Sequence, residues 1–177
     1  MRFLLTIVFV IVAGCTTRGK LVETTISLNP DTELHFVDYH YSESEMEKCK
    51  QDFSSCLKNG LPTFGTSSSF GIFTSLPRSH LVELRLRYRD IEYKLETLHM
   101  YESRSNKKSK SKSNVQYFYA NCFDAKNCLV RGLFSDAAGS YVAEWKIVDG
   151  IALRSILTST RDIVHKFIKN INPPVYD

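Results

Sequence analysis

The amino-acid sequence predicts an α+β domain: a mostly antiparallel sheet with two helices packed on one face, stapled by disulfides. Three observations predict this class. Apolar and polar residues alternate over several short segments, the pattern of half-buried strands. Asp149-Gly150 joins two of these segments, as expected for a two-residue hairpin turn. Near the C-terminus, apolar residues recur at helical spacing instead.

Alternation predicts the strands in chain order. The first two span residues 21–28 and 32–41. Residues 81–101 change parity in the middle, which predicts a turn or bulge at Arg89-Asp90. The remaining strands are predicted at residues 115–123, 128–134, 141–148 and 151–158. In the last hairpin, Trp145 falls opposite Arg154, which predicts a cation–π pair.

Two helices follow from capping and periodicity. Ser44 is the predicted N-cap of the first, with Glu47 at the capping-box position, and that helix runs to Phe53 or Leu57. Ser159 or Thr160 is expected to cap the second helix, and Asn172-Pro173-Pro174 to end it. The apolar face of this second helix is predicted to contain Ile163, Val164, Phe167, Ile168 and Ile171.

The start of the chain has the layout of a secretory signal. Arg2 precedes an apolar stretch over residues 3–13, and Gly14-Cys15 follows. A membrane-spanning helix needs about 20 apolar residues, roughly twice this length. Residues 1–14 are therefore predicted to be a signal peptide.

Val12-Ala13-Gly14-Cys15 resembles the bacterial lipobox, in which an aliphatic and two small residues precede a cysteine. The resemblance implies that Cys15 is acylated after cleavage, which makes the chain a lipoprotein with a tether over residues 15–20 and a single domain over residues 21–177. Thr16 stands where inner-membrane retention signals have Asp, which implies the periplasmic face of the outer membrane. The alternative is a secreted protein with an incidental cysteine.

The positive charge is concentrated in one segment. The formal net charge is +4, and residues 103–114 contain five basic residues and no acidic one. This segment lacks apolar residues, so we expect a mobile loop, or a contact with anionic lipid or an acidic partner. An exported lipoprotein does not normally meet nucleic acid, so no nucleic-acid partner is expected. The basic candidates for partner binding are Arg104, Lys107, Lys108, Lys110 and Lys112.

Four further cysteines predict two disulfides in an oxidising compartment. Cys122 and Cys128 flank a short turn-like segment, and Cys49 and Cys56 are close in sequence. Local pairs 49–56 and 122–128 are predicted, and the two cross-linked arrangements remain open. The cysteine and histidine spacings match no zinc motif, so neither a metal nor a cofactor is expected.

No catalytic motif is complete. The segment Gly65–Ser69 begins like a nucleophile elbow but ends in Ser69 instead of glycine. An enzyme is therefore not expected. Residues 60–78 form a loop that contains aromatic candidates for contact with a partner, namely Phe64, Phe70 and Phe73.

Residues 143–174 (AEWKIVDGIALRSILTSTRDIVHKFIKNINPP) resemble the C-terminal part of small lipoproteins that protect cells from type VI secretion phospholipase effectors. The resemblance lies in the order of strands, hairpin and helix. It implies an immunity protein that binds a toxic secreted effector and occludes its active site. The alternative is a structural or assembly lipoprotein of a secretion or envelope-maintenance complex.

Overall fold

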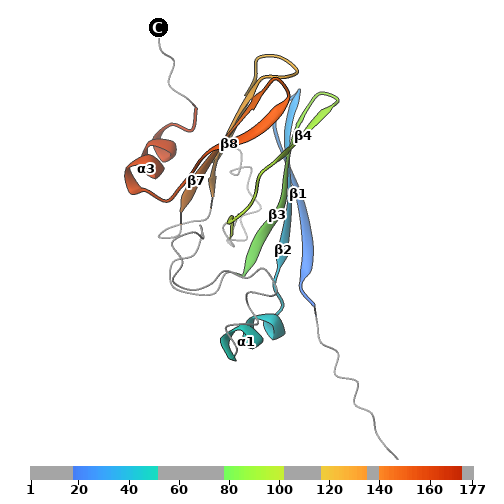
Figure 1. The fold of residues 1–177 in the computed structure, drawn as a ribbon, viewed down its shortest axis with the longest axis vertical. Coiled ribbons are helices and arrows are strands. Elements are labelled where there is room, and N and C mark those ends of the chain that lie inside the picture. The colour runs from blue at the N-terminus through green and yellow to red at the C-terminus, as the bar shows by residue number, and fades with distance from the viewer. Residues whose placement is uncertain (1–17, 52–77, 102–116, 135–139, 173–177) are drawn as a thin grey trace, which may run out of the picture.

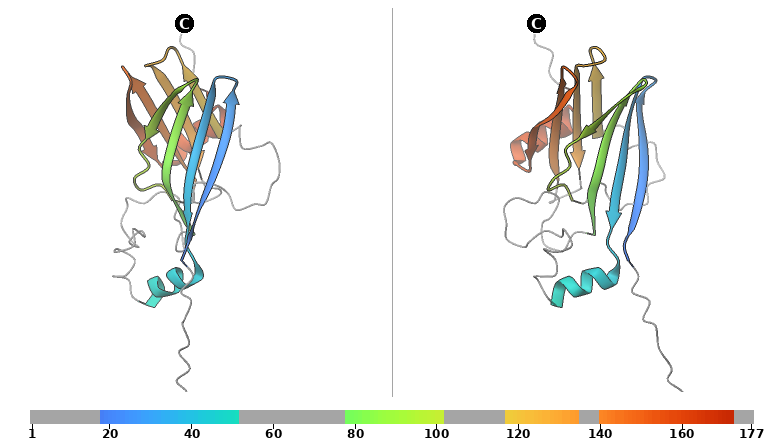
Figure 2. Two further views of the ribbon diagram at one scale, coloured as in Figure 1. Left: turned by 90° about the vertical axis from the view of Figure 1, so that its right-hand side faces the viewer. Right: turned by 45° about the vertical axis from the view of Figure 1, so that its right-hand side comes forward.

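The chain folds into two antiparallel sheets that face each other (Figures 1 and 2). The computed structural model describes residues 18–51, 78–101, 117–134 and 140–172. In the order β1-β2-β3-β4 and β5-β6-β7-β8, each strand pairs with its neighbours along the chain. The prediction of mostly antiparallel structure is confirmed. The strands are divided between two four-stranded sheets, so each sheet covers the apolar face of the other.

The first sheet contains β1 (Lys20–Asn29), β2 (Thr32–His40), β3 (Ser79–Tyr88) and β4 (Ile91–Leu95). The predicted turn at Arg89-Asp90 is confirmed, since it separates β3 from β4. The outer face of this sheet is charged, and ion pairs such as Arg87–Glu33 join neighbouring strands. Alternation therefore directs the apolar residues of this sheet inward, toward the second sheet.

The second sheet contains β5 (Phe118–Cys122), β6 (Cys128–Phe134), β7 (Tyr141–Val148) and β8 (Ile151–Thr158). The last three strands have the predicted bounds. The two residues of the predicted Asp149-Gly150 turn have φ values of 52° and 83°. Two consecutive positive φ angles are what a tight two-residue hairpin requires, which explains the Asp-Gly pair.

The core lies between the sheets. Strands β2 to β7 each contribute at least two buried side chains to it, β1 contributes Ile26, and β8 contributes only the partly buried Ala152 and Leu157. Phe134 lies at its centre, with ring centroids 5.4 Å from Phe118, 5.2 Å from Tyr141 and 6.0 Å from Trp145. Phe118 in turn contacts Phe36 of the first sheet at 5.2 Å. Aromatic packing therefore runs continuously from one sheet to the other.

Hydrogen bonds join the sheets along the edge where β4 and β8 meet. Trp145 donates its indole N–H to the Glu96 carbonyl at 3.0 Å, and Arg154 donates to the Leu98 carbonyl at 2.7 Å. The predicted register of Trp145 opposite Arg154 is confirmed. The guanidinium does not form the predicted cation–π pair. It bonds instead to the chain that follows β4, including the Glu96 carboxylate at 2.8 Å.

The prediction that both helices pack on one face is wrong. Helix α3 (Arg161–Lys169) lies against β6 and β7 on the outer face of the second sheet, whereas α1 (Glu43–Gln51) lies at the end of the sandwich where β1 begins (Figure 1). The sequence of α1, ESEMEKCKQ, is mostly charged and polar. It therefore has no apolar stripe wide enough to cover a sheet.

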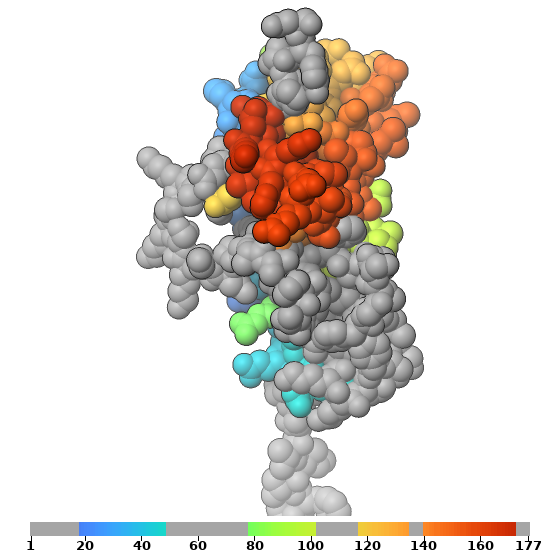
Figure 3. Space-filling view, turned by 90° about the vertical axis from the view of Figure 1, so that its left-hand side faces the viewer, coloured from blue at the N-terminus to red at the C-terminus, as the bar shows by residue number. Residues whose placement is uncertain are grey.

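Helix α3 buries a narrower face than predicted. Val164 and Phe167 are buried and pack with Val142 and Leu133, whereas Ile163 and Ile168 are 36% and 58% exposed. Thr160 precedes the helix, as predicted, but its side chain makes no capping hydrogen bond, and the helix ends at Lys169, before Asn172. Figure 3 shows α3 in red, with the orange surface of β7 and β8 uncovered beside it.

A buried ion pair lies beneath α3. Arg131 on β6 and Glu144 on β7 are paired in register and form a salt bridge of 2.8 Å. Glu144 also accepts a hydrogen bond from the Ser155 hydroxyl, and the Arg131 guanidinium lies 5.0 Å from the centre of the Phe167 ring. The helix therefore excludes water from a charged pair whose groups are satisfied by each other.

We expect Arg131→Ala to lower the free energy of unfolding by about 3 kcal/mol, because it leaves the Glu144 carboxylate buried without its ion-pair partner. Arg87→Ala removes a cation from an exposed pair and is expected to cost at most about 1 kcal/mol. Urea denaturation of both variants measures the difference. Equal losses would show that the pair under α3 is not isolated from solvent.

Candidate functional site

The sequence-predicted contact residues all lie outside the described residues, and these predictions stand untested. Cys15, Cys56 and the side chain of Cys49 are also outside the described part of the chain. The contact residues concerned are Phe64, Phe70, Phe73, Arg104, Lys107, Lys108, Lys110 and Lys112.

The Cys122–Cys128 disulfide is confirmed. The two cysteines are directly opposite each other at the ends of β5 and β6, and their bond closes the turn between these strands. Arrangements that pair either residue with Cys49 or Cys56 are therefore wrong. The 49–56 pair stays a prediction.

Four hairpin turns lie together at one end of the sandwich, which we call the hairpin end (Figure 2). They are Pro30-Asp31, Arg89-Asp90, 123–127 and Asp149-Gly150. Backbone hydrogen bonds connect them in pairs: Arg89 N–H donates to the Asp31 carbonyl at 2.8 Å, and Gly150 N–H to the Lys126 carbonyl at 2.9 Å. The Tyr93 hydroxyl of the first sheet donates to the Ala125 carbonyl of the second. The turns are thus held in one arrangement.

The disulfide-closed turn holds an aromatic side chain in solvent. Phe123 is 76% exposed, the largest exposure of any large apolar residue in the described part of the chain. Its backbone is fixed, because its N–H donates to the Asn127 carbonyl and the Asp124 carboxylate accepts from Lys126 N–H at 2.6 Å. The side chain of Asn127 also bonds to Asp124 and lowers the pKa of that carboxyl. Phe123 is therefore exposed on a preorganised turn.

Other apolar side chains flank the same turns. Val148 and Ile151, paired in register beside Asp149-Gly150, are 49% and 63% exposed, and Ile91, after Arg89-Asp90, is 40% exposed. We call Phe123, Ile91, Val148 and Ile151 the hairpin-end residues. All four lie in or beside turns at the same end of the sandwich, where another molecule can contact them together. Sequence alternation did not identify them, since it placed Phe123 at the end of a strand.

At the opposite end, Ser42 and Glu45 form the capping box of α1. Glu45 N–H donates to the Ser42 hydroxyl at 3.3 Å, and the Glu45 carboxylate accepts from Ser42 N–H at 2.8 Å. The predicted cap, Ser44 with Glu47, is therefore wrong by two residues. The Tyr39 hydroxyl and the Gly19 N–H also donate to the Glu45 carboxylate, at 2.6 and 3.0 Å. These bonds favour Glu45 over Glu47 as the acidic residue of the capping box. Burial raises the pKa of Glu45, but these hydrogen bonds outweigh it and the net pKa is lowered.

His80 lies among tyrosines at this end. Tyr41 and His80 are hydrogen-bonded through Oη and Nδ1 at 2.6 Å, and the rings of Tyr39 and Tyr101 lie 5.5 and 6.3 Å from the imidazole. Burial raises the pKa of Tyr41, so the phenol keeps its proton. Burial lowers the pKa of His80, and the nearby Asp38 carboxylate only partly opposes this shift.

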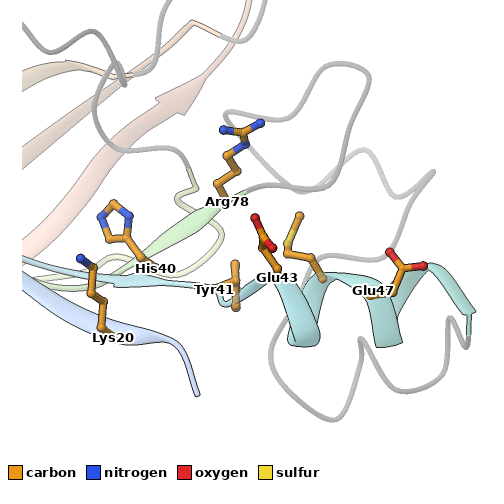
Figure 4. A pocket seen from close by; sticks show the side chains of 7 residues that line it. Lys20, His40, Tyr41, Glu43, Glu47 and Arg78 are labelled. Carbon is orange, nitrogen blue, oxygen red and sulfur yellow. The ribbon is translucent and has the colours of Figure 1, made fainter. Parts of the chain in front are cut away.

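A pocket of about 780 Å³ opens beside this cluster, where β1 begins, β2 ends and α1 starts (Figure 4). Lys20 and His40, which are register partners, lie at the strand side of the pocket, and Glu43 projects from the first turn of the helix. We call this the N-terminal pocket. It is lined by Lys20, His40, Glu43, Met46, Glu47 and Arg78, with Tyr41 between the two walls.

Comparison with known protein families, with curated proteins and with solved structures finds no match to this chain. In the described segments, no helix is long and apolar enough to cross a membrane. No group of three or more His, Cys, Asp or Glu among the described residues could hold a metal ion.

Digestion of the non-reduced protein with trypsin tests the disulfides directly. Trypsin cleaves after Lys126, within the disulfide-closed turn, so the two resulting peptides should remain joined through Cys122 and Cys128. Cleavage after Lys48 and Lys50 should likewise leave the Cys49 peptide joined to the Cys56 peptide. A mass that joins the Cys49 and Cys122 peptides would contradict this arrangement.

The cluster around His80 predicts a dependence of stability on pH. Because folding lowers the pKa of His80 below its usual 6.5, the unfolded chain binds the proton more readily. The contribution of His80 to the free energy of unfolding is therefore complete above pH 6.5 and is lost as the pH falls below that value. Glu45 adds no loss in this range, because its pKa is lowered from 4.5.

We expect His80→Gln to flatten the fall in unfolding free energy between about pH 7.5 and pH 5.5, measured by urea denaturation. His165→Gln, at an exposed position on α3, is the matched control. An unchanged slope in the His80 variant would show that the imidazole is not disfavoured as a cation in the folded protein.

Proposed function

We propose that this protein is an envelope-anchored immunity lipoprotein that binds a toxic secreted effector of the type VI phospholipase type and occludes its active site. Acylation of Cys15 attaches the chain to the periplasmic face of the outer membrane. The folded domain begins only a few residues later, at β1. The domain acts by binding and not by catalysis.

The exposure of Phe123 on its disulfide-closed turn is the observation that supports this proposal most strongly. An aromatic side chain contributes large contact area to an interface, and a rigid backbone reduces the entropy that is lost on binding. Phe123 is 76% exposed although its turn is closed by a disulfide and several hydrogen bonds. A partner with a concave apolar cleft fits such a side chain.

The placement of the two ends supports the same function. β1 begins at the N-terminal end and runs ten residues to the hairpin end. At roughly 3.4 Å per residue, the hairpin-end residues lie about 30 Å from the start of β1. Residues 15–20 attach the domain at its N-terminal end, so the hairpin-end residues lie at the end of the domain farther from the attachment point, where a protein that enters the periplasm can reach them.

Affinity purification of the tagged, acylated full chain from its own cells tests the proposed function. We expect one secreted hydrolase at near one-to-one stoichiometry, and we expect the purified protein to inhibit that hydrolase. Recovery of resident envelope or secretion components without such an enzyme would contradict the proposal and favour the structural lipoprotein.

We expect Phe123→Ala to weaken binding of the captured hydrolase about thirtyfold, or about 2 kcal/mol, because the truncation removes the exposed aromatic anchor. Ile168→Ala removes an apolar side chain of similar exposure on α3 and should leave affinity within about twofold. Isothermal titration calorimetry measures both. Equal effects of the two substitutions would exclude the hairpin end as the contact surface.

A further inference from the structure

The N-terminal pocket separates opposite charges onto two walls. The Lys20 ammonium lies on the strand side, beside its register partner His40, and the Glu43 and Glu47 carboxylates lie on the helix side (Figure 4). This arrangement follows from the local fold. The β1–β2 ladder places Lys20 opposite His40, and α1 begins three residues after β2 ends, so its first turn faces the end of that ladder.

Lys20 and Glu43 do not neutralise each other. Among the described residues, neither the Lys20 ammonium nor the Glu43 carboxylate forms an ion pair, although many exposed charges on the first sheet do. The Tyr41 hydroxyl is held by its hydrogen bond to His80, so the side chain of Tyr41 contributes its aromatic ring to the pocket lining. The pocket therefore offers a cationic side, an anionic side and an apolar element between them.

The pocket also lies close to the proposed anchor, on which this inference rests. Lys20 is five positions after Cys15 in the sequence. A fully extended chain spans at most about 18 Å over five residues. If Cys15 carries acyl chains in the bilayer, the pocket therefore lies near the level of the lipid head groups.

We propose that the N-terminal pocket binds a phosphate ester that carries a primary ammonium group, supplied by the ethanolamine phospholipid of the anchoring membrane. The phosphate lies against Lys20, and the ammonium group donates to Glu43. The pocket volume of about 780 Å³ is sufficient for such a group. A purely anionic head group is disfavoured by the carboxylates, and a quaternary ammonium group has no N–H to donate to them.

Such binding would orient the domain. An acyl tether alone leaves the sandwich free to rotate at the membrane surface, whereas a bound head group fixes the N-terminal end against it. The hairpin end then points into the periplasm. The pocket thus complements the proposed binding of an effector at the opposite end.

Nuclear magnetic resonance of the acylated full chain in a non-phosphate detergent tests the proposal, with the Met46 methyl and His40 ring signals as reporters. Glycerophosphoethanolamine should shift both signals saturably, and glycerophosphate or ethanolamine alone should bind roughly tenfold more weakly. Lys20→Glu and Glu43→Lys should each weaken binding of the ester roughly tenfold. Lys146→Glu, at an exposed position on β7, is the matched control and should have no effect.

Nanodiscs identify the source of the ligand. Discs of phosphatidylethanolamine should shift the same signals without added ester, whereas discs of phosphatidylglycerol should not. A response to the soluble ester alone would overturn the membrane source. Equal binding of glycerophosphate, or no saturable shift with any ester, would overturn the zwitterion site itself.

The two proposals fail separately. If no hydrolase is captured but the ester binds, the immunity function is wrong and the pocket assignment stands. If the hydrolase binds with unchanged affinity to a Lys20→Glu variant and no ester binds the wild type, only the pocket assignment is wrong.

Discussion

The packing of Trp145 between the two sheets determines how the rest of the molecule is arranged. This side chain is fully buried, contacts the Phe134 ring, and donates its indole N–H to the Glu96 carbonyl. Truncation of a buried tryptophan typically costs about 3–5 kcal/mol. Truncation would remove packing and a hydrogen bond that join the two sheets, because Trp145 belongs to β7 and Glu96 follows β4. The relative position of the sheets, and of every surface feature that combines residues from both, depends on this contact.

The two ends of the sandwich differ in chemistry because they are built differently. At the hairpin end, short turns with special backbone angles, one disulfide and several cross-turn hydrogen bonds hold the backbone, so apolar side chains such as Phe123 and Ile151 remain exposed on a rigid support. At the N-terminal end, polar groups converge instead. Glu45 accepts hydrogen bonds from the capping residue, from Tyr39 and from Gly19, and it thereby joins the start of β1 to α1. One end suits a protein contact and the other a charged ligand.

Sequence patterns predicted the second sheet well, because Asp149-Gly150 and the Cys122–Cys128 pair mark its turns and alternation marks its strands. Sequence patterns failed where two local structures are equally compatible with the same residues. Ser42–Glu45 and Ser44–Glu47 are overlapping capping boxes, and only the distant Gly19 and Tyr39 select the first. Alternation shows which side of a strand is apolar but not which layer covers it, so a second sheet could not be distinguished from covering helices.

The candidate sites were less accessible from sequence for a similar reason. The exposure of Phe123 depends on the closure of its turn, and the N-terminal pocket depends on the meeting of β1, β2 and α1. Neither feature follows from the alternation or capping patterns of the sequence. An apolar residue directly after a turn cysteine and before an Asp-containing turn is the only signal that could have drawn attention to Phe123.

Site-specific photo-crosslinking in living cells tests the central claim most directly: the acylated protein meets a secreted effector through its hairpin end. A photoreactive phenylalanine analogue is placed at position 123 in one variant and, as a comparison, at position 168 on α3 in another. The account predicts that position 123 crosslinks to a secreted hydrolase and that position 168 does not. Equal crosslinking of both positions to resident envelope proteins, with no secreted enzyme from position 123, would contradict it.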